Sequence, residues 1–450
     1  MTGKVRPMPE SLLGRMFANV AWLLGGKGFG AVCSLAYLAI LTRSLGLKDF
    51  GHFSLIFGTS QALIAIAGFQ TWRVVVRYGA KHVHEKDWGA FGRLGMLAGA
   101  LDAVGAILGC LIAWIAIYQF GDVLDLNPRL MDTAFWFVVA ALWALVSAPT
   151  GIVRALDRFD MAVYVEAIVP LGRLLGGLAV WWTGPTLVKF LIVWAAVDLI
   201  ESVIYWAMAK YLAPDSIRLR NLFHWKAAAE ENPGIGRFFM ITYASASLEA
   251  TMRHGPLLAV GYFIGTSAAG LYRLAHQLAQ GLSKLSGLLT RAAYAEISRA
   301  RVAAKVEEFR KLAVQTTKIA GVAGMLLVGI AVAIGGDMLA LLSGEEFRPA
   351  FTVLIPLTVA ASFELASVAF EPVLHSTGRA RYALAARLIA VCAMVTALLI
   401  FVQSGGAPGA AWAVALGGAV GYLAMGSMAL ITLKRVTREE TSRDSAEASG

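Results

Sequence analysis

The sequence predicts an all-α polytopic membrane protein with twelve transmembrane helices. Twelve separate apolar runs are each long enough to cross a bilayer, whose hydrocarbon core requires about 20 residues of helix. The composition agrees, because 58% of the residues are hydrophobic and only 15% are charged. The expected spans are 17–42, 50–71, 94–119, 133–153, 161–183, 187–211, 237–264, 268–290, 314–335, 349–372, 382–403 and 408–433.

The distribution of Lys and Arg predicts that both termini lie in the cytoplasm. The two termini and the loops on their side carry 29 of the 39 Lys and Arg residues, whereas the loops on the opposite side carry five. Cytoplasmic loops are enriched in these residues, and an even number of spans also places both ends on one side. The same distribution accounts for the net charge of +10, so the charge predicts contact with anionic membrane lipids and no nucleic-acid partner.

The chain is expected to form two lobes of six helices each, at residues 1–211 and 237–436. The stretch 212–236 is polar and interrupts the series of apolar runs, which predicts a cytoplasmic linker between the lobes. Residues 437–450 are polar and lack apolar periodicity, which predicts a disordered cytoplasmic tail.

The two predicted lobes resemble each other around their first turn. Five identities and one aromatic exchange recur at a constant offset of 219 residues. The pairs are Gly46 and Gly265, Gly51 and Gly270, Phe53 and Tyr272, Leu55 and Leu274, Gln61 and Gln280, and Leu63 and Leu282. Because both members fall at the same turn in the same topological sense, they predict parallel repeats related by an axis along the membrane normal. A cavity between two such lobes is typical of alternating-access transporters.

Polar residues inside the spans indicate a wet, cationic chamber. A charge at the bilayer centre costs about 2.5–3.5 kcal/mol on insertion scales, so each one requires a partner or a purpose. The candidate cavity residues on spans one, seven and eight are Asn19, Lys27, Glu249, Arg253, Arg273, His276, Gln277, Gln280 and Lys284. The four cations among them suit a diphosphate, whose oxygens accept charge-assisted hydrogen bonds from Arg and Lys. For Arg253 and Lys284, snorkelling to the membrane interface is the alternative.

A second polar group lies on spans five and six. Glu166 and Arg173 share one helix face, and Asp198 and Glu201 lie on the neighbouring span. Arg173 paired with either carboxylate would hold the N-terminal lobe together. The alternative is that these side chains line the cavity, or that one of the carboxylates takes up a proton during transport.

Nothing in the sequence indicates an enzyme. There is no nucleotide-binding GxxxxGK[ST] loop, no catalytic triad and no metal-hydrolase spacing. We therefore expect no cofactor and no metal. Transport would be driven by H⁺, by Na⁺ or by the membrane potential, and the sequence does not distinguish among these three.

Five segments of the chain form a recognisable series: LTRSLGLKDFG at 41–51, AAGLYRLA at 268–275, LSGEEF at 342–347, STGR at 376–379 and GGAPGAAW at 405–412. They resemble segments of bacterial polysaccharide flippases, of the O-antigen type, in the multidrug/oligosaccharidyl-lipid/polysaccharide (MOP) exporter superfamily. Their order and spacing match over nearly the whole chain. Ala295 departs from the pattern, because relatives often carry proline there.

The resemblance implies a flippase that carries polyprenyl-diphosphate-linked oligosaccharide from the cytoplasmic to the periplasmic leaflet of a bacterial inner membrane. It further implies a cavity lined mainly by spans one, two, seven and eight, and a monomer; a polysaccharide polymerase as partner stays open. A cation-coupled multidrug exporter of the same superfamily is the main alternative, but such exporters usually carry an acidic residue in the first span, where this chain has only Lys27. A membrane glycosyltransferase or polymerase would need larger periplasmic loops, and the peptidoglycan-precursor branch typically has fourteen spans.

Overall fold

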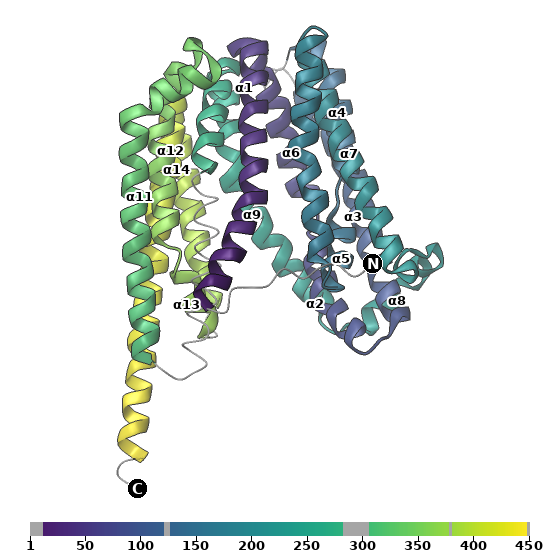
Figure 1. Ribbon diagram of the computed structural model, residues 1–450, viewed down its shortest axis with the longest axis vertical. Coiled ribbons are helices and arrows are strands. Elements are labelled where there is room, and N and C mark those ends of the chain that lie inside the picture. Colours follow the sequence, from purple (N-terminus) through teal and green to yellow (C-terminus); the bar gives the residue numbers. More distant parts are fainter. Residues whose placement is uncertain (1–11, 121–126, 282–305, 378–379, 448–450) are drawn as a thin grey trace. The chain divides into compact units, whose positions relative to one another are not determined.

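The computed structural model describes residues 12–120, 127–281, 306–377 and 380–447, and these are mostly α-helical (Figure 1). Seven helical segments of this part are long and apolar enough to cross a membrane, which confirms the predicted all-α membrane class. The helices are α1 (Leu12–Ala67), α2 (Thr71–His84), α3 (Trp88–Phe120), η2 (Pro128–Leu130), α4 (Met131–Trp143), α5 (Ser147–Ala155), α6 (Phe159–Trp182), α7 (Leu187–Leu212), η3 (Pro214–Ile217), η4 (Leu219–His224), α8 (Trp225–Glu230), α9 (Ile235–Ile264), a helix at 266–281, α11 (Val306–Ser343), η5 (Glu345–Ala350), α12 (Phe351–Ala366), α13 (Phe370–Ser376) and α14 (Ala380–Glu447).

Two long helices each contain two predicted spans joined at a glycine bend. α1 bends at Gly46 (φ 71°, ψ 175°) and α14 bends at Gly406 (φ 59°, ψ −142°). Backbone conformations of this kind are essentially restricted to glycine. Both bends fall in the gaps predicted between consecutive spans, so the apolar runs located these turns.

The structure also contains interruptions that the sequence analysis did not predict. The second span ends at Ala67, and a separate helix, α2, begins at Thr71 in a stretch predicted to be a cytoplasmic loop. The fourth span is divided at 144–146 into α4 and α5, and the tenth at 367–369 into α12 and α13. The apolar pattern continues through the breaks in both spans, so hydrophobicity alone gives no signal for them.

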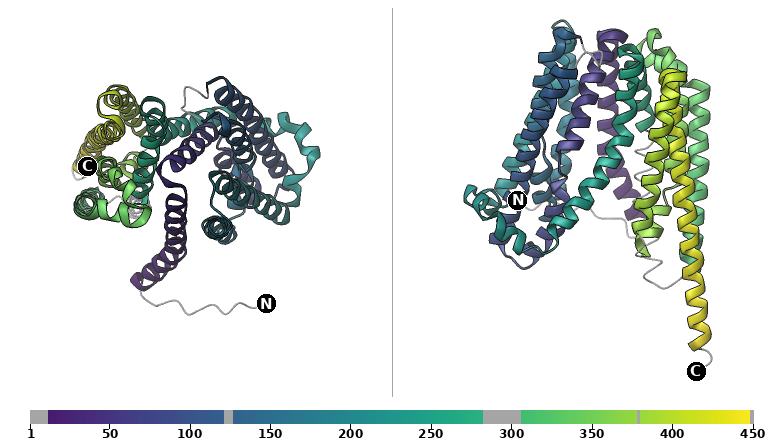
Figure 2. Two further views of the ribbon diagram at one scale, coloured as in Figure 1. Left: turned by 90° about the horizontal axis from the view of Figure 1, so that it is seen from above. Right: turned by 180° about the vertical axis from the view of Figure 1, so that it is seen from behind.

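The C-terminal segment differs from its prediction. Residues from 437 were expected to be disordered, but α14 continues to Glu447 and extends past the other helices of its unit (Figure 2). The sequence spacing of Glu439 and Arg443 is the i,i+4 spacing of opposite charges that favours a helix. Low hydrophobicity therefore did not exclude helix formation here.

The contacts divide the chain into two compact units. The first unit comprises Met1–Ser44, Thr71–Asp102 and Trp143–Pro233, and the second comprises Leu45–Gln70, Ala103–Leu142 and Gly234–Gly450. Within the first unit α6 packs beside α7 and α2 beside α5; within the second, α12 packs between α11 and α14 (Figure 1). The predicted division into two six-helix lobes at 212–236 follows the sequence repeat, and it stays a prediction.

The predicted linker consists of short helices that are anchored within the first unit. Arg93 on α3 makes two hydrogen bonds to Glu231, through Nε to Oε2 and through Nη2 to Oε1. His82 Nε2 on α2 lies 2.9 Å from Asn232 Oδ1, and both residues are buried. The end of the linker is therefore held by a charge-assisted pair and a buried polar contact.

Within the second unit, the repeated turns of the two halves pack directly against each other. A Cβ atom at Gly51 would collide with the backbone carbonyl of Thr266, and one at Gly270 would lie 3.2 Å from the Cα of Gly51. Gly265 has φ 107° and ψ 179°, close to the values of its repeat partner Gly46. Residues paired by the sequence repeat therefore share a backbone conformation or meet in space.

Replacing Gly51 with alanine should lower the apparent Tm of the detergent-solubilised protein. The added methyl group meets backbone atoms that cannot yield, and overpacking of this kind costs about 1–3 kcal/mol. Gly329→Ala on α11 is the matched control, because nothing lies within 4 Å of its added methyl group. Thermal unfolding followed by intrinsic fluorescence compares the two variants, and equal Tm values would contradict the close packing.

Candidate functional site

A ladder of aromatic rings lies along α1 after its bend. Phe50, Phe53 and Phe57 are spaced three and four residues apart, which places them on one helix face. Their ring centroids are 6.4 and 6.3 Å apart, with interplanar angles of 13° in both pairs. The three rings therefore form a continuous aromatic surface within the second unit, and we call this surface the aromatic wall.

Arg273 on the helix 266–281 packs against this wall. Its guanidinium carbon lies 3.9 Å from the ring centroid of Phe57 and 5.7 Å from that of Phe53, and the residue is only 9% exposed. A cation–π contact contributes about 0.5–1 kcal/mol at exposed sites and about 2 kcal/mol or more where it is desolvated. Eight residues separate Arg273 from the turn at Gly265, or about 12 Å of helix, which places this cation inside the apolar span.

Further polar groups follow Arg273 along the same helix. The ring of Tyr272, which is buried, stacks on that of His276 with centroids 5.9 Å apart. The amide nitrogen of Gln280 lies 3.5 Å from His276 Nε2, and Gln277 is half-buried. The candidate cavity residues Arg273, His276, Gln277 and Gln280 therefore follow one another within two turns of this helix, and we call these four residues the polar stripe.

Charged groups of α9 act on the same stripe. Arg253, His254 and Arg273 all interact electrostatically with His276. Glu249 and Arg253 form an i,i+4 ion pair with 3.8 Å between Oε1 and Nη2, and both side chains are about half exposed. The structure thus gathers the cations Arg253 and Arg273 near one histidine. It adds His254, which the sequence analysis passed over.

Three predicted cavity residues lie outside the part of the structure that can be described. Lys284 falls in the segment 282–305, and the side chains of Asn19 and Lys27 on α1 are not described. Their convergence with Arg273 stays a prediction.

The second polar group shows one of its predicted pairings. Arg173 Nη2 donates a hydrogen bond of 2.6 Å to Asp198 Oδ1, as predicted for a clamp between spans five and six. The guanidinium carbon also lies 3.7 Å from the ring centroid of Trp194, a contact that the sequence analysis did not predict. Trp194 and Asp198 are four residues apart, so the helical spacing could have indicated that both face Arg173.

The remaining carboxylates of this group lie close to the clamp. Glu166 Oε1 accepts hydrogen bonds from Arg154 Nη2 at 3.2 Å and from the Tyr205 hydroxyl at 3.4 Å. Glu201 interacts electrostatically with Asp198, Arg173 and Glu166. The predicted group is therefore one interacting cluster within the first unit.

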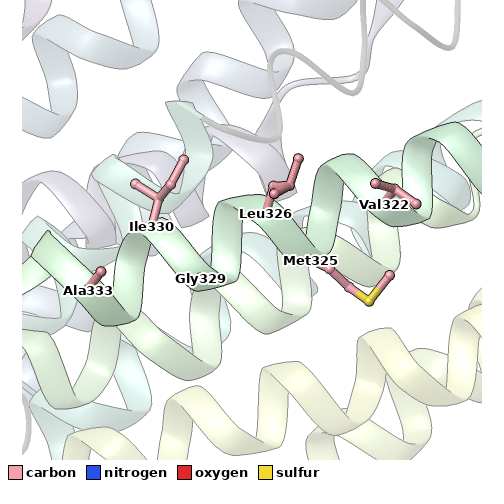
Figure 3. A pocket seen from close by; sticks show the side chains of 6 residues that line it. All are labelled: Val322, Met325, Leu326, Gly329, Ile330 and Ala333. Carbon is pink, nitrogen blue, oxygen red and sulfur yellow. The ribbon is translucent and has the colours of Figure 1, made fainter.

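An apolar groove on α11 has a different character. Figure 3 shows its lining on successive turns of this one helix, and the residues are Val322, Met325, Leu326, Gly329, Ile330 and Ala333. Met325 and Leu326 are more than 60% exposed. All six lining residues are apolar or glycine, so the groove lacks the polar groups that a sugar or a diphosphate requires. An exposed apolar face on a membrane-spanning helix is instead the kind of surface that lipid chains cover.

Solved structures with the same fold are transporters. An inward-facing multidrug resistance MATE transporter of the MOP superfamily matches with a TM-score of 0.69 at 14% identity, over 90% of this chain and 96% of its own. The lipid II flippase MurJ, in an inward closed conformation, matches with a TM-score of 0.71 at 10% identity, over 91% of this chain and 88% of its own. The chain therefore shares the fold of these two proteins.

The family follows from the sequence comparison. The model of the polysaccharide biosynthesis protein family matches residues 16–301, which is more than half of the chain. The chain belongs to this family. A relative, the inner membrane protein YghQ of Escherichia coli (strain K12), is 25% identical over 347 residues, covering 75% of this chain and 94% of its own length. The family resemblance deduced from the turn segments is confirmed.

Removing one partner of the Arg173 clamp should be more damaging than removing both. Arg173→Met leaves the mostly buried Asp198 without its cation, a change that costs about 3–5 kcal/mol in buried pairs. The double variant Arg173→Met/Asp198→Asn should recover part of the lost Tm in thermal unfolding. A double variant less stable than either single variant would show that the pair is not the clamp.

Proposed function

We propose that the protein is a flippase that moves polyprenyl-diphosphate-linked oligosaccharide repeat units from the cytoplasmic to the periplasmic leaflet of a bacterial inner membrane. Membership of the polysaccharide biosynthesis family and the MOP fold support a transport role in making polysaccharide. The observation that carries the proposal is Arg273, a cation buried in a span of a transporter fold.

Arg273 is the residue best suited to bind the diphosphate. Its guanidinium carbon lies over the rings of Phe53 and Phe57, which stabilise the charge, and the planar guanidinium offers a fork of N–H donors that matches phosphate oxygens. Charge-assisted bonds to phosphate oxygens are strengthened where water is excluded, as they would be inside the span.

The neighbouring polar groups would complete the site. His276, Gln277 and Gln280 offer donors and acceptors of the kind that sugar hydroxyls require. Arg253, and with it Lys27 and Lys284, would add positive charge around the diphosphate. The proposal assigns the lipid chain to the bilayer outside this polar stripe.

Transport would follow alternating access by two six-helix lobes with both termini in the cytoplasm. The excess of Lys and Arg on the cytoplasmic side supports this orientation for twelve spans. Coupling to H⁺ or Na⁺, or to the membrane potential, would drive the cycle, and Glu166, Asp198 and Glu201 are candidate groups for an ion. We propose a monomer, with a polysaccharide polymerase as a further partner.

A cation-coupled multidrug exporter is the second candidate, because a MATE transporter shares the fold. The residues of the first predicted span argue against it, since 17–42 contains Lys27 and no carboxylate. A cationic drug would meet charge of the same sign there.

Measuring the lipid-linked glycans of cells that lack the protein tests the proposed substrate directly. Cells depleted of the protein should accumulate one polyprenyl-diphosphate-linked repeat unit, measured by mass spectrometry of extracted lipids against undepleted cells. An unchanged lipid pool together with increased drug susceptibility would favour the exporter instead.

The role of Arg273 can be separated from folding with three variants. Arg273→Met should abolish export while leaving insertion and Tm near the wild type, because it removes the charge and keeps much of the side-chain volume. Arg273→Lys should retain part of the activity, since the charge remains but the planar fork is lost. Arg348→Met is the matched control, because its exposed guanidinium pairs with Asp337 away from the stripe. Polymer output measures all three, and normal output from Arg273→Met combined with Lys27→Ala would refute the diphosphate assignment.

A further inference from the structure

A buried carboxylate on α3 lies at the starts of two other helices in the first unit. Asp102 is 6% exposed, and its Oδ1 accepts a hydrogen bond of 2.8 Å from the hydroxyl of Thr71. Its Oδ2 accepts one of 2.7 Å from the backbone N–H of Ala148. Thr71 is the first residue of α2, and Ala148 is the second residue of α5.

A chain of hydrogen bonds joins the two helix starts to this carboxylate. The backbone N–H of Trp72 donates to Ser147 Oγ at 3.1 Å, and the hydroxyls of Ser147 and Thr71 are 2.9 Å apart. Because Thr71 has one hydroxyl proton and gives it to Asp102, Ser147 donates to Thr71. Every donor in the chain therefore points toward the carboxylate.

This arrangement satisfies N–H groups that a helix start leaves without intrahelical partners. The positive ends of both helix dipoles also favour the anion. α2 and α5 are packed closely as well, since a Cβ at Gly151 would lie 2.8 Å from both the Cα of Trp72 and the Cβ of Val75. One carboxylate thus accepts hydrogen bonds from α2 and α5, which also pack closely against each other.

The hydrogen bonds of Asp102 lie near points where the chain passes between the two compact units. The chain passes between the two compact units after residues 44, 70, 102, 142 and 233. One of these passages falls directly before Thr71, one directly after Asp102, and one five residues before Ser147. Gln70 has a φ of 52°, so the backbone turns sharply just before α2. Broken backbone within a membrane protein is tolerated where protein groups satisfy it, and transporters place discontinuous helices at their substrate and ion sites.

The break in the tenth span shows that a carboxylate is not needed merely to interrupt a helix. Between α12 and α13, Ser367 Oγ donates to the carbonyl of Glu364, and Phe370 N–H donates to the carbonyl of Ser367. These bonds are local to one chain segment. The bonds to Asp102 instead tie the starts of two separate helices, α2 and α5, to a third helix, α3.

We infer that Asp102 is a positioning residue for transport. With Thr71 and Ser147 it forms a clasp, the Asp102 clasp, which fixes the starts of α2 and α5 so that these helices move as one body. The transport cycle in this inference rests on the proposed function, whereas the clasp itself is a property of the first unit alone.

Distances between spin labels test the clasp in the full-length protein in lipid nanodiscs. Labels at Lys81 and Asp157, both exposed, report on the ends of α2 and α5 after the three native cysteines are replaced. Thr71→Val and Asp102→Asn should broaden the Lys81–Asp157 distance distribution measured by double electron–electron resonance. The same variants should lower the turnover of export several-fold at unchanged apparent KM.

Two conservative variants separate the clasp from general packing. Thr71→Ser keeps the hydroxyl and, unlike Thr71→Val, should show the narrow distance distribution and the turnover of the wild type. Thr42→Val is the matched control, because this buried hydroxyl donates only along its own helix, to the carbonyls of Leu38 and Ala39. Thr71→Val keeps the inference testable if Asp102→Asn fails to fold, since it changes the side chain without altering its size.

The outcomes distinguish the clasp from the proposed function. Narrow distributions in both Thr71→Val and Asp102→Asn would overturn the clasp. Broad distributions with wild-type export would overturn its role in transport. If the protein moves no lipid-linked glycan, the distance measurement still decides whether α2 and α5 are joined by Asp102.

Discussion

The need to satisfy backbone hydrogen bonds without water governs this structure. Inside the hydrocarbon region only helices satisfy their own N–H and C=O groups, so the described chain is mostly helical and its sharp bends need special support. At Gly46 and Gly265 that support is glycine itself, in a conformation other residues avoid. At Thr71 and Ala148 it is a side chain from another helix, the carboxylate of Asp102.

The elements that the sequence predicted well are those with a strong one-dimensional signal. Apolar length located the spans, and the gaps between apolar runs located the bends at Gly46 and Gly406. The repeat predicted that Gly51 and Gly270 are equivalent, and the structure places them in contact. The breaks at 144–146 and 367–369 were not predictable in this way, because they depend on hydrogen bonds to residues distant in sequence or on local backbone turns within an apolar run.

The candidate site shows the same limit at the level of side chains. Helical periodicity predicted that Arg273, Gln277 and Gln280 form one stripe with His276 beside them, and it could do so because polar residues in a span are conspicuous. Phe53 and Phe57 carry no such signal, since aromatic residues in a span resemble any lipid-facing or packing residue. Their contacts with Arg273 therefore required the three-dimensional structure. Trp194 differs, because its spacing of four residues from Asp198 was a signal that the sequence analysis did not use.

Arg173 and Arg273 have partners of different kinds. Arg173 is bonded to Asp198 and lies on Trp194, so binding an anion there would have to displace a carboxylate and leave its charge without a cation. Arg273 lies over the rings of Phe53 and Phe57, which attract a cation but carry no net charge. Arg173 is consequently suited to holding two helices together. The proposed diphosphate would add its own charge-assisted bonds to the ring contacts of Arg273.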